Sequence, residues 1–316
     1  MKKHQPKLIV ILGPTSSGKT KLAVKLAKFF NGSPRFSAAG EIVSADSRQV
    51  YKGMDIGTGK DLKEYGEIPY HLIDIASPKT QFSLAKYQKL AYRTIDDIIK
   101  RGKTPFLVGG TGLYLQSIVD GYQLSPAKPN KKLRQYLNMR TLEQLQGLAN
   151  KYKIRLNQSD FHNKRRLVRA VEKAKSEIYD TRLVPSQAEG CTISDMRKAK
   201  YDCLILGLRY PKQVIALRID KRLIHRLEKE GLTREVKKLR RQGVSWKRLE
   251  DFGLEYRFIA KYLKGELNYD EMVKKLATAI HQFAKRQMTW FKRMKKIHWM
   301  NNVIEAEKLI KKFIKN

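Results

Sequence analysis

The sequence predicts an α/β protein whose mostly parallel sheet carries helices on both faces. Two observations lead to this prediction. Short apolar runs typical of buried strands alternate with longer segments in which apolar residues recur at helical spacing. The first of these runs is followed by Gly-x-x-x-x-Gly-Lys-Thr, a pattern that joins a strand to a helix. With 316 residues and 41% hydrophobic content, the chain suits one large domain or a core with a smaller lobe.

The individual elements follow from apolar periodicity. Strands are expected at 8–12, 41–44, 71–74, 104–108 and 201–209. Helices are expected at 21–30, 83–101, 131–163, 164–175, 211–230, 233–242, 254–264, 269–294 and 305–314. Ser83 is a plausible N-cap for the second helix, and Pro211 suits the first turn of the helix after the last strand.

The middle of the chain differs from its two ends. Residues 125–130 contain Pro126 and Pro129 and indicate a boundary, and the helical segments after them are polar with a weak apolar face. Residues 176–200 have no clear periodicity and predict a loop. We therefore expect a P-loop core at 1–125, a mainly helical insertion at 126–200 and a return to the core with C-terminal helices at 201–316.

The stretch after the first strand predicts a polyphosphate site and a P-loop NTPase-like fold. It consists of Gly13, Pro14, Thr15, Ser16, Ser17, Gly18, Lys19 and Thr20. Its two glycines let the backbone curl so that successive N–H groups point inward, and the following helix adds its positive end. Lys19 supplies a full charge, and the Thr20 hydroxyl can hold Mg²⁺. A loop without a phosphate ligand is the alternative.

Two further segments lie where parallel strands end. Asp46 follows the second strand directly, so it is expected beside the phosphate loop at the carboxyl edge of the sheet. Its carboxylate can accept a proton or coordinate Mg²⁺, although capping the next turn is the alternative. Thr111 lies in Gly-Gly-Thr-Gly after the 104–108 strand, where an ordinary turn is the alternative. No acidic residue ends that strand and no Asn-Lys-x-Asp occurs, so a motor or switch GTPase is not expected.

The charge of the chain indicates an anionic partner. Its formal net charge is +36, from 66 Lys and Arg against 30 Asp and Glu, which favours nucleic acid over the alternatives of a basic proteome or a membrane surface. Cations cluster at 164–169 and again at 281–299, where Phe283, Trp290 and Phe291 lie between them. This mixture suits phosphate contacts and base stacking, although core packing is the preferred explanation for Trp290 and Phe291.

Several classes of protein are not expected. The two cysteines form no Cys-x-x-Cys pair and the six histidines form no ligand-spaced cluster, so neither a disulfide scaffold nor a zinc site is indicated. The apolar run near the start is too short for a signal peptide, and no stretch approaches the ~18 apolar residues of a membrane span. We expect a cytoplasmic protein that does not bind membranes.

The motifs, taken in order, resemble those of the tRNA dimethylallyltransferases. The resemblance rests on G-P-T-x-x-G-K-T at 13–20, S-A-D-S-R-Q-V-Y-K-G-M-D-I-G-T at 44–58, H-L-I-D at 71–74, L-V-G-G-T-G-L-Y at 107–114, N-x-R-R-L-x-R-A-x-E at 163–172 and Q-F-A-K-R-Q-x-T-W-F at 282–291. It implies transfer of a dimethylallyl group from dimethylallyl diphosphate to N6 of the adenosine 3′ to the anticodon in tRNA, with release of diphosphate. It also implies Mg²⁺ on Thr20 and a monomer that binds the tRNA anticodon stem-loop.

The resemblance also implies roles for individual residues. Asp46 is expected to take the proton from N6, Thr111 to lie near the reacting centre, and Lys19 to act on the diphosphate. Lys212 and Arg218 are expected to bind diphosphate together with the phosphate loop. The expected tRNA contacts are Asp46, Ser47, Arg48, Gln49, Arg165, Arg166, Leu167, Val168, Arg169, Phe252, Gly253, Leu254, Glu255, Tyr256, Arg257, Lys285 and Arg286.

Two positions depart from the family pattern, and other functions stay open. Lys212 stands where the family usually has Arg, and Glu255 stands where it usually has Gly before Tyr-Arg. A lysine offers diphosphate a point charge instead of a two-pronged contact. Prenylation of free adenine nucleotides, a small-molecule kinase and a non-enzymatic RNA-binding protein are the alternatives. The charge of +36 favours tRNA over a free nucleotide.

Overall fold

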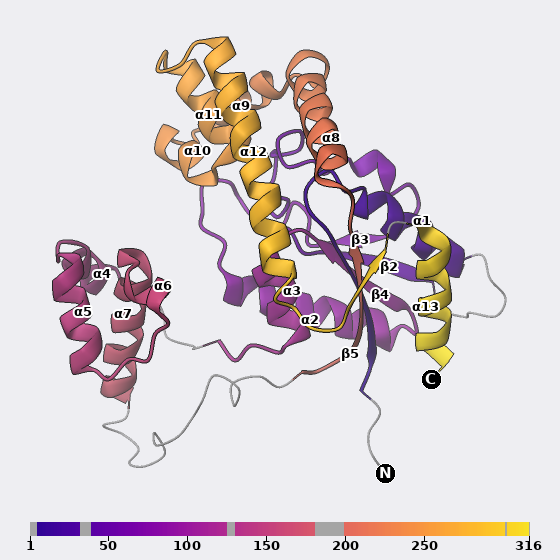
Figure 1. Ribbon diagram of the computed structural model, residues 1–316, viewed down its shortest axis with the longest axis horizontal. Coiled ribbons are helices and arrows are strands. Elements are labelled where there is room, and N and C mark those ends of the chain that lie inside the picture. Colours follow the sequence, from indigo (N-terminus) through magenta and orange to yellow (C-terminus); the bar gives the residue numbers. More distant parts are fainter. Residues whose placement is uncertain (1–4, 32–38, 125–129, 181–198, 301, 316) are drawn as a thin grey trace. The chain divides into compact units, whose positions relative to one another are not determined.

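The computed structural model of the chain describes residues 5–31, 39–124, 130–180, 199–300 and 302–315 (Figure 1). The chain divides into two compact units. Unit 1 comprises Met1–Tyr122 and Lys198–Asn316, and unit 2 comprises Gln123–Arg197. The sequence-based boundaries at 125/126 and 200/201 lie within a few residues of these limits.

Unit 1 is built on a six-stranded sheet in the order β3-β2-β4-β1-β5-β6, in which every neighbouring pair is parallel. The strands are β1 Lys7–Leu12, β2 Gly40–Ser44, β3 Tyr70–His71, β4 Thr104–Gly109, β5 Asp202–Leu208 and β6 Ile297–Met300. β1 is central, with Ile9 opposite Phe106 of β4 and Leu204 of β5. The carboxyl ends of β2, β4 and β1 therefore lie in a row.

The ends of the sheet differ from the expectation. The strand expected at 71–74 stops at His71, because Leu72 and Asp74 have positive φ angles of 64° and 57° that break the extended backbone. β6 was not expected, since its four residues follow a basic segment and no apolar alternation marks them. It pairs with β5 at the edge of the sheet.

Helices cover both faces of the sheet, as expected for this class. Ile9 and Ile11 of β1 pack against α1 Lys19–Asn31 and α13 Val303–Lys315 on one face. Leu8, Val10 and Leu12 pack on the other face against α2 Leu84–Lys100 and α3 Gly112–Val119. Successive residues of a strand point to opposite faces, so an apolar run such as that of β1 serves both layers. The predicted α/β class is confirmed.

A further group of helices follows β5. It contains α8 Lys212–His225, which continues as the π-helical η3 Arg226–Glu230, then α9 Leu232–Arg241, α10 Trp246–Phe252, α11 Leu254–Leu263 and α12 Tyr269–Phe291. These helices share an apolar core that includes Val50, Tyr51 and Met54 from the segment after β2. The long α12 runs from this group to the neighbourhood of α3 (Figure 1). Of the helices described in unit 1, the sequence did not predict α3, α10 or the short 3₁₀ turn η1 Leu62–Glu64.

Unit 2 is helical. It contains α4 Lys131–Asn138, α5 Leu142–Lys151, α6 Gln158–Phe161 and α7 Lys164–Asp180. Its core is formed by Leu137, Leu145, Ala149, Leu167, Val168 and Val171. α7 continues to Asp180, so residues 176–180 are helical and not part of a loop as expected; residues 181–198 of the expected loop lie outside the described part of the chain.

Two residues of unit 2 that were expected to contact tRNA, Leu167 and Val168, have side chains that cannot reach it from the surface. Leu167 and Val168 are buried on the inner face of α7, where they hold the unit together. Arg165 on the same helix is exposed, Arg166 pairs with Asp160, and Arg169 pairs with the buried Glu172. The helix therefore presents its arginines outward and its apolar pair inward.

Among the helices of the described residues, none is long and apolar enough to cross a membrane.

Candidate active site

A cavity of about 1200 Å³ lies at the carboxyl edge of the sheet in unit 1. Its wall combines loops that follow three neighbouring strands with residues of α8, α11 and α12. From the sequence-predicted set it gathers Thr15, Ser16, Ser17, Gly18, Lys19, Thr20, Asp46, Ser47, Arg48, Gln49, Thr111, Arg218, Phe252, Gly253, Leu254, Glu255, Arg257 and Arg286. Residues far apart in the sequence thus share one site.

Other predicted residues lie off the wall. Gly13 and Pro14 start the phosphate loop behind it. Lys212 is exposed in the first turn of α8 and does not line the cavity, so its contact with diphosphate stays a prediction. Tyr256 is buried with its hydroxyl donating to Glu235 at 2.8 Å, which corrects its predicted tRNA contact. Lys285 is exposed beside the cavity wall.

The phosphate loop has the geometry of an anion-binding nest. Ser16 and Gly18 have φ angles of 61° and 79°, which turn successive N–H groups inward before α1 begins. A side chain at Gly13 would place its Cβ 2.6 Å from Ser17 Oγ, so any larger residue there would displace the Ser17 hydroxyl. The hydroxyls of Ser16 and Ser17 are buried without a partner among the described residues. The loop therefore holds unused donors.

Two partly buried cations face the same cavity. Burial lowers the pKa of Lys19 to about 8, although the nearby Asp46 carboxylate opposes this shift. Burial and the neighbouring Arg226 lower the pKa of Arg222 to about 10, and its Nη2 donates to Thr15 Oγ1 at 2.5 Å. A desolvated cation is stabilised by a bound anion, so this part of the cavity suits a polyphosphate.

Arg222 and Arg226, which no sequence motif marked, line the cavity together with Arg218. The three are spaced four residues apart and so share one face of α8 and its π-helical continuation. Arg218 also stacks on Tyr210, with its guanidinium carbon 4.3 Å from the ring centroid. The i, i+4 spacing is the signal that would have identified them.

Asp46 lies in the loop after β2, on the wall shared with Lys19. Its Oδ1 accepts the backbone N–H groups of Arg48 and Gln49, at 2.8 and 3.4 Å, so it caps the next turn as well as facing the cavity. Thr111 joins this loop to the one after β4, because its Oγ1 accepts the N–H of Ser47 at 3.0 Å. Asp46 therefore caps the next turn, as the alternative interpretation expected, and lines the cavity as well.

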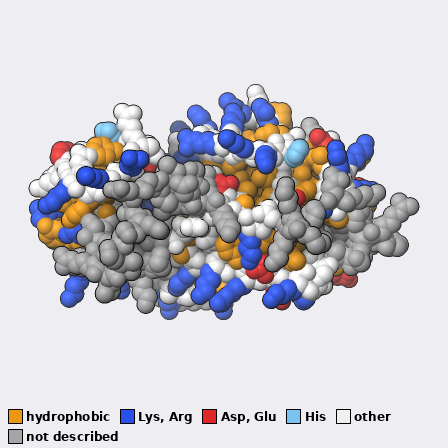
Figure 2. All heavy atoms as spheres, turned by 90° about the horizontal axis from the view of Figure 1, so that it is seen from below, with side chains coloured by type: hydrophobic (Ala, Val, Ile, Leu, Met, Phe, Trp, Pro, Cys, Tyr) orange, Lys and Arg blue, Asp and Glu red, His pale blue; other side chains and the backbone are white. Residues whose placement is uncertain are grey.

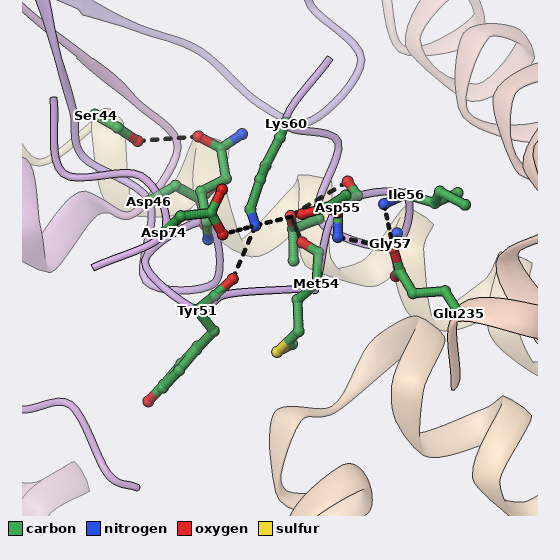
Figure 3. Close-up of polar contacts among 12 residues, drawn as sticks. Ser44, Asp46, Tyr51, Met54, Asp55, Ile56, Gly57, Lys60, Asp74 and Glu235 are labelled. Carbon is green, nitrogen blue, oxygen red and sulfur yellow. Dashed lines mark hydrogen bonds and ion pairs between the residues drawn. The ribbon is translucent and has the colours of Figure 1, made fainter. Parts of the chain in front are cut away.

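A buried lysine organises the segment that follows Asp46 (Figure 3). Lys60 is only 1% exposed, and its Nζ donates to the carbonyl of Tyr51 at 2.8 Å. It also pairs with the carboxylates of Asp55 at 2.6 Å and Asp74 at 2.5 Å. A buried ammonium needs such partners, and here they fold 51–60 into a closed loop.

Glu235 of α9 holds the same segment from the opposite side (Figure 3). Its carboxylate accepts the backbone N–H groups of Asp55, Ile56 and Gly57 at 2.8, 2.7 and 3.1 Å. Gln49 is then tied to the segment, because its Nε2 donates to the carbonyl of Gly59 at 3.0 Å. The short stretch that carries Asp46 is thus anchored to a helix almost 180 residues later in the chain.

The basic aromatic segment of α12 has two faces. Phe291 is buried in the core under the sheet, as preferred from the sequence. Phe283, Arg286 and Trp290 line the cavity instead. The ring of Trp290 packs so closely on Gly112 that a Cβ there would lie 2.3 Å from Trp290 Cδ1. Core packing is therefore confirmed for Phe291, and Trp290 packs partly against the same core while it also lines the cavity.

Fold and site define a P-loop enzyme: a parallel sheet, a phosphate loop after its central strand, and a carboxylate on the same cavity. The family model described as IPP transferase matches residues 49–294. The chain is 45% identical over 298 residues to tRNA dimethylallyltransferase 1 of Geotalea uraniireducens, covering 93% of this chain and 92% of that one. It is 44% identical to tRNA dimethylallyltransferase 2 of Treponema denticola, covering 92% and 95%.

Solved structures of transferases that act on tRNA also resemble this chain. A tRNA isopentenylpyrophosphate transferase from Bacillus halodurans matches with a TM-score of 0.69 and 32% identity, over 97% of this chain and 96% of that one. A eukaryotic dimethylallyltransferase acting on tRNA matches with a TM-score of 0.76 and 25% identity, over 98% and 80%. The chain belongs to the IPP transferase family, which confirms the resemblance found in its motifs.

Proposed function

We propose that this protein transfers a dimethylallyl group from dimethylallyl diphosphate to N6 of the adenosine 3′ to the anticodon in tRNA, with release of diphosphate. The observation that carries the proposal is that the phosphate loop, the partly buried Lys19 and the Asp46 carboxylate all open onto one cavity. Family membership and the names of the relatives support it.

The diphosphate half of the reaction uses the phosphate loop. As the allylic carbon–oxygen bond breaks, its electron pair leaves with the diphosphate, whose negative charge grows. The inward N–H groups of the loop and the charges of Lys19 and Arg222 stabilise that charge without having to reorganise. Attack takes place at carbon, so a phosphate loop serves here without hydrolysis of a nucleotide.

Magnesium fits this half of the site. Within the described residues, no group of three or more His, Cys, Asp or Glu side chains would hold a metal ion by itself. Thr20 opens onto the cavity beside the loop, and Mg²⁺ is commonly bound by few protein groups together with substrate phosphates. We assign Mg²⁺ to Thr20 and the diphosphate oxygens, where it would neutralise charge on the leaving group.

The adenine half needs a base. The lone pair of the exocyclic N6 is delocalised into the ring, so N6 becomes a good nucleophile only as its proton leaves. The proton passes to the carboxylate of Asp46 while the new N6–carbon bond forms. Thr111 fixes the loop that carries Asp46 through Ser47, so its role is to hold the base in place. The step balances: the N6 lone pair forms the new bond to carbon, the N6 proton goes to Asp46, and the electron pair of the broken carbon–oxygen bond leaves with diphosphate.

The tRNA is held by the basic surface. Lys and Arg side chains predominate over acidic ones on the face drawn in Figure 2. Arg48, Arg257 and Arg286 line the cavity at the places expected for RNA contacts. An unpaired adenosine of the anticodon loop enters such a cavity at little unstacking cost, and closure around it excludes water. The protein acts as a monomer on the anticodon stem-loop.

The experiment combines purified protein, Mg²⁺, dimethylallyl diphosphate and unmodified tRNA, followed by mass analysis of the tRNA nucleosides. We expect an adenosine heavier by one dimethylallyl group, and no product with Asp46→Ala. Asp270→Ala, which removes an exposed acid from the first turn of α12, is the matched control. Product from AMP or ATP instead of tRNA would favour the free-nucleotide alternative, and phosphate transfer from ATP the kinase alternative.

A further inference from the structure

The side chain of Gln287 bridges two loops of the active-site cavity. This residue of α12 is buried, and its Oε1 accepts the backbone N–H of Thr15 at 2.8 Å. Its Nε2 donates to the carbonyl of Gly110 at 2.8 Å. Thr15 and Gly110 follow β1 and β4, which are neighbours in the sheet. A neutral amide is suited to this task, because it offers a donor and an acceptor at one end.

Each bridged loop carries a different part of the chemistry. Thr15 belongs to the phosphate loop that leads to Lys19. Gly110 directly precedes Thr111, whose Oγ1 accepts the N–H of Ser47, the residue after Asp46. A continuous hydrogen-bonded path therefore runs from the diphosphate cradle through the amide to the loop of the base. Removal of the amide interrupts this path at its midpoint.

Gly110 is shaped for this contact. A Cβ added there would lie 2.5 Å from Gln287 Nε2, whereas its next nearest neighbours are 3.6 Å away. The backbone at Gly110 is not in the left-handed region that favours glycine. The absence of a side chain at this position thus serves the approach of the amide.

We propose that Gln287 is a positioning residue that sets the separation between the diphosphate cradle and the Asp46 carboxylate. The proposal rests on the proposed prenyl transfer, in which N6, the allylic carbon and the leaving oxygen must align. Neither diphosphate binding nor tRNA binding requires a fixed separation between the two bridged loops, whereas the transfer step does. A misplacement of about 1 Å can cost on the order of 100-fold in rate.

The test uses Gln287→Met, which keeps the length of the side chain, and Gln287→Glu, which keeps an acceptor for Thr15 but turns an oxygen toward the Gly110 carbonyl. Thr289→Ala, on the exposed side of the same helix, is the control. Single-turnover prenylation is measured with both substrates saturating, and dissociation constants are measured for inorganic pyrophosphate with Mg²⁺ and for tRNA. We expect a rate lower by about 10- to 100-fold, with both dissociation constants within about threefold of wild type.

Two results would overturn the inference. One is a transfer rate within about twofold of wild type in both variants. The other is a loss of pyrophosphate binding that accounts for the whole loss of rate, since Gln287 would then be part of the cradle itself. An inactive wild type would instead contradict the proposed function, so the two failures are distinguishable.

A second pair of variants covers a failure to fold. Gly110→Ala disturbs the same contact from the Gly110 side, because the added methyl group presses against the side-chain amide of Gln287. Combined with Gln287→Ala, it forms a double-mutant cycle on one contact, so the two losses in rate should be clearly less than multiplicative. Fully multiplicative losses would show that the two residues act independently, which the proposal forbids.

Discussion

Glu235 offers the sharpest test of how the Asp46 loop is held. In the native protein its Oε2 accepts the N–H groups of Asp55 and Ile56, and its Oε1 accepts the N–H of Gly57 (Figure 3). The same Oε1 also accepts the hydroxyl of Tyr256. All four partners are donors, so the site is built for a carboxylate. Replacing Glu235 with Gln puts an NH₂ group where one acceptor oxygen was.

The size of the effect follows from this geometry. The favourable amide orientation places NH₂ at the Oε1 position, where the Tyr256 hydroxyl can rotate to accept, and leaves only the Gly57 N–H without a partner. One unsatisfied buried donor and the loss of charge assistance cost about 1–3 kcal/mol. Glu235→Ala removes all four bonds, so we expect about 3–6 kcal/mol, limited by water entering the opened loop.

The assay compares urea unfolding, amide hydrogen exchange and prenyl transfer for Glu235→Gln, Glu235→Ala and Glu228→Ala, an exposed control in η3. Exchange at residues 55–57 should accelerate in the order wild type, Gln, Ala. The transfer rate should fall in the same order, because Gln49 loses its anchor at Gly59. If Glu235→Ala keeps native protection at 55–57 and loses less than about 1 kcal/mol, the carboxylate does not hold this loop.

Four further predictions concern charge and burial. The pKa of Lys19 in the free protein is about 8, below its value of 10.5 in an unfolded chain, so pyrophosphate affinity should weaken as the pH rises above 8. Lys19→Arg should flatten this pH profile, and an unchanged profile would show that Lys19 does not bind the anion. The same depressed pKa means that the unfolded state binds more protons between pH 8 and 10.5, so the Lys19 contribution to stability rises across this window, and a difference urea titration against Lys19→Arg measures it. Binding of tRNA should weaken steeply with salt, and Arg48→Ala should reduce the slope of log K against log salt by about one, as measured by filter binding; equal slopes would exclude a phosphate contact. Leu167→Ala should destabilise unit 2 by about 2–5 kcal/mol in proteolysis experiments, whereas Arg165→Ala should leave stability unchanged; equal effects would argue against the inward orientation of Leu167.

The sequence was sufficient to predict features that depend on local pattern. The phosphate loop, Asp46 and Thr111 each follow an apolar strand, and the carboxyl ends of parallel strands meet at one edge. β6 was missed because a strand of four residues that follows a basic segment is too short to show a clear pattern in the sequence. Lys212 was placed at the cavity by resemblance, yet the turn of α8 points the later Arg218 and Arg222 there.

The residues that the sequence could not identify share a physical cause. Glu235 and Gln287 both come from helices after β5, and both bind backbone groups of loops that lie before residue 111. Their partners are N–H and C=O groups, which every residue has, so no motif of complementary side chains marks these contacts in the chain.

The active site is built from loops that act on substrate and from later helices that hold these loops in place. The loops after β1, β2 and β4 carry the groups that act on substrate, but loops are the mobile part of an α/β fold. Rigid helices from the second half of the chain reach back and hold each loop by buried hydrogen bonds. The separation between base and leaving group is then a property of α9 and α12, so activity should be sensitive to substitutions that contact neither substrate.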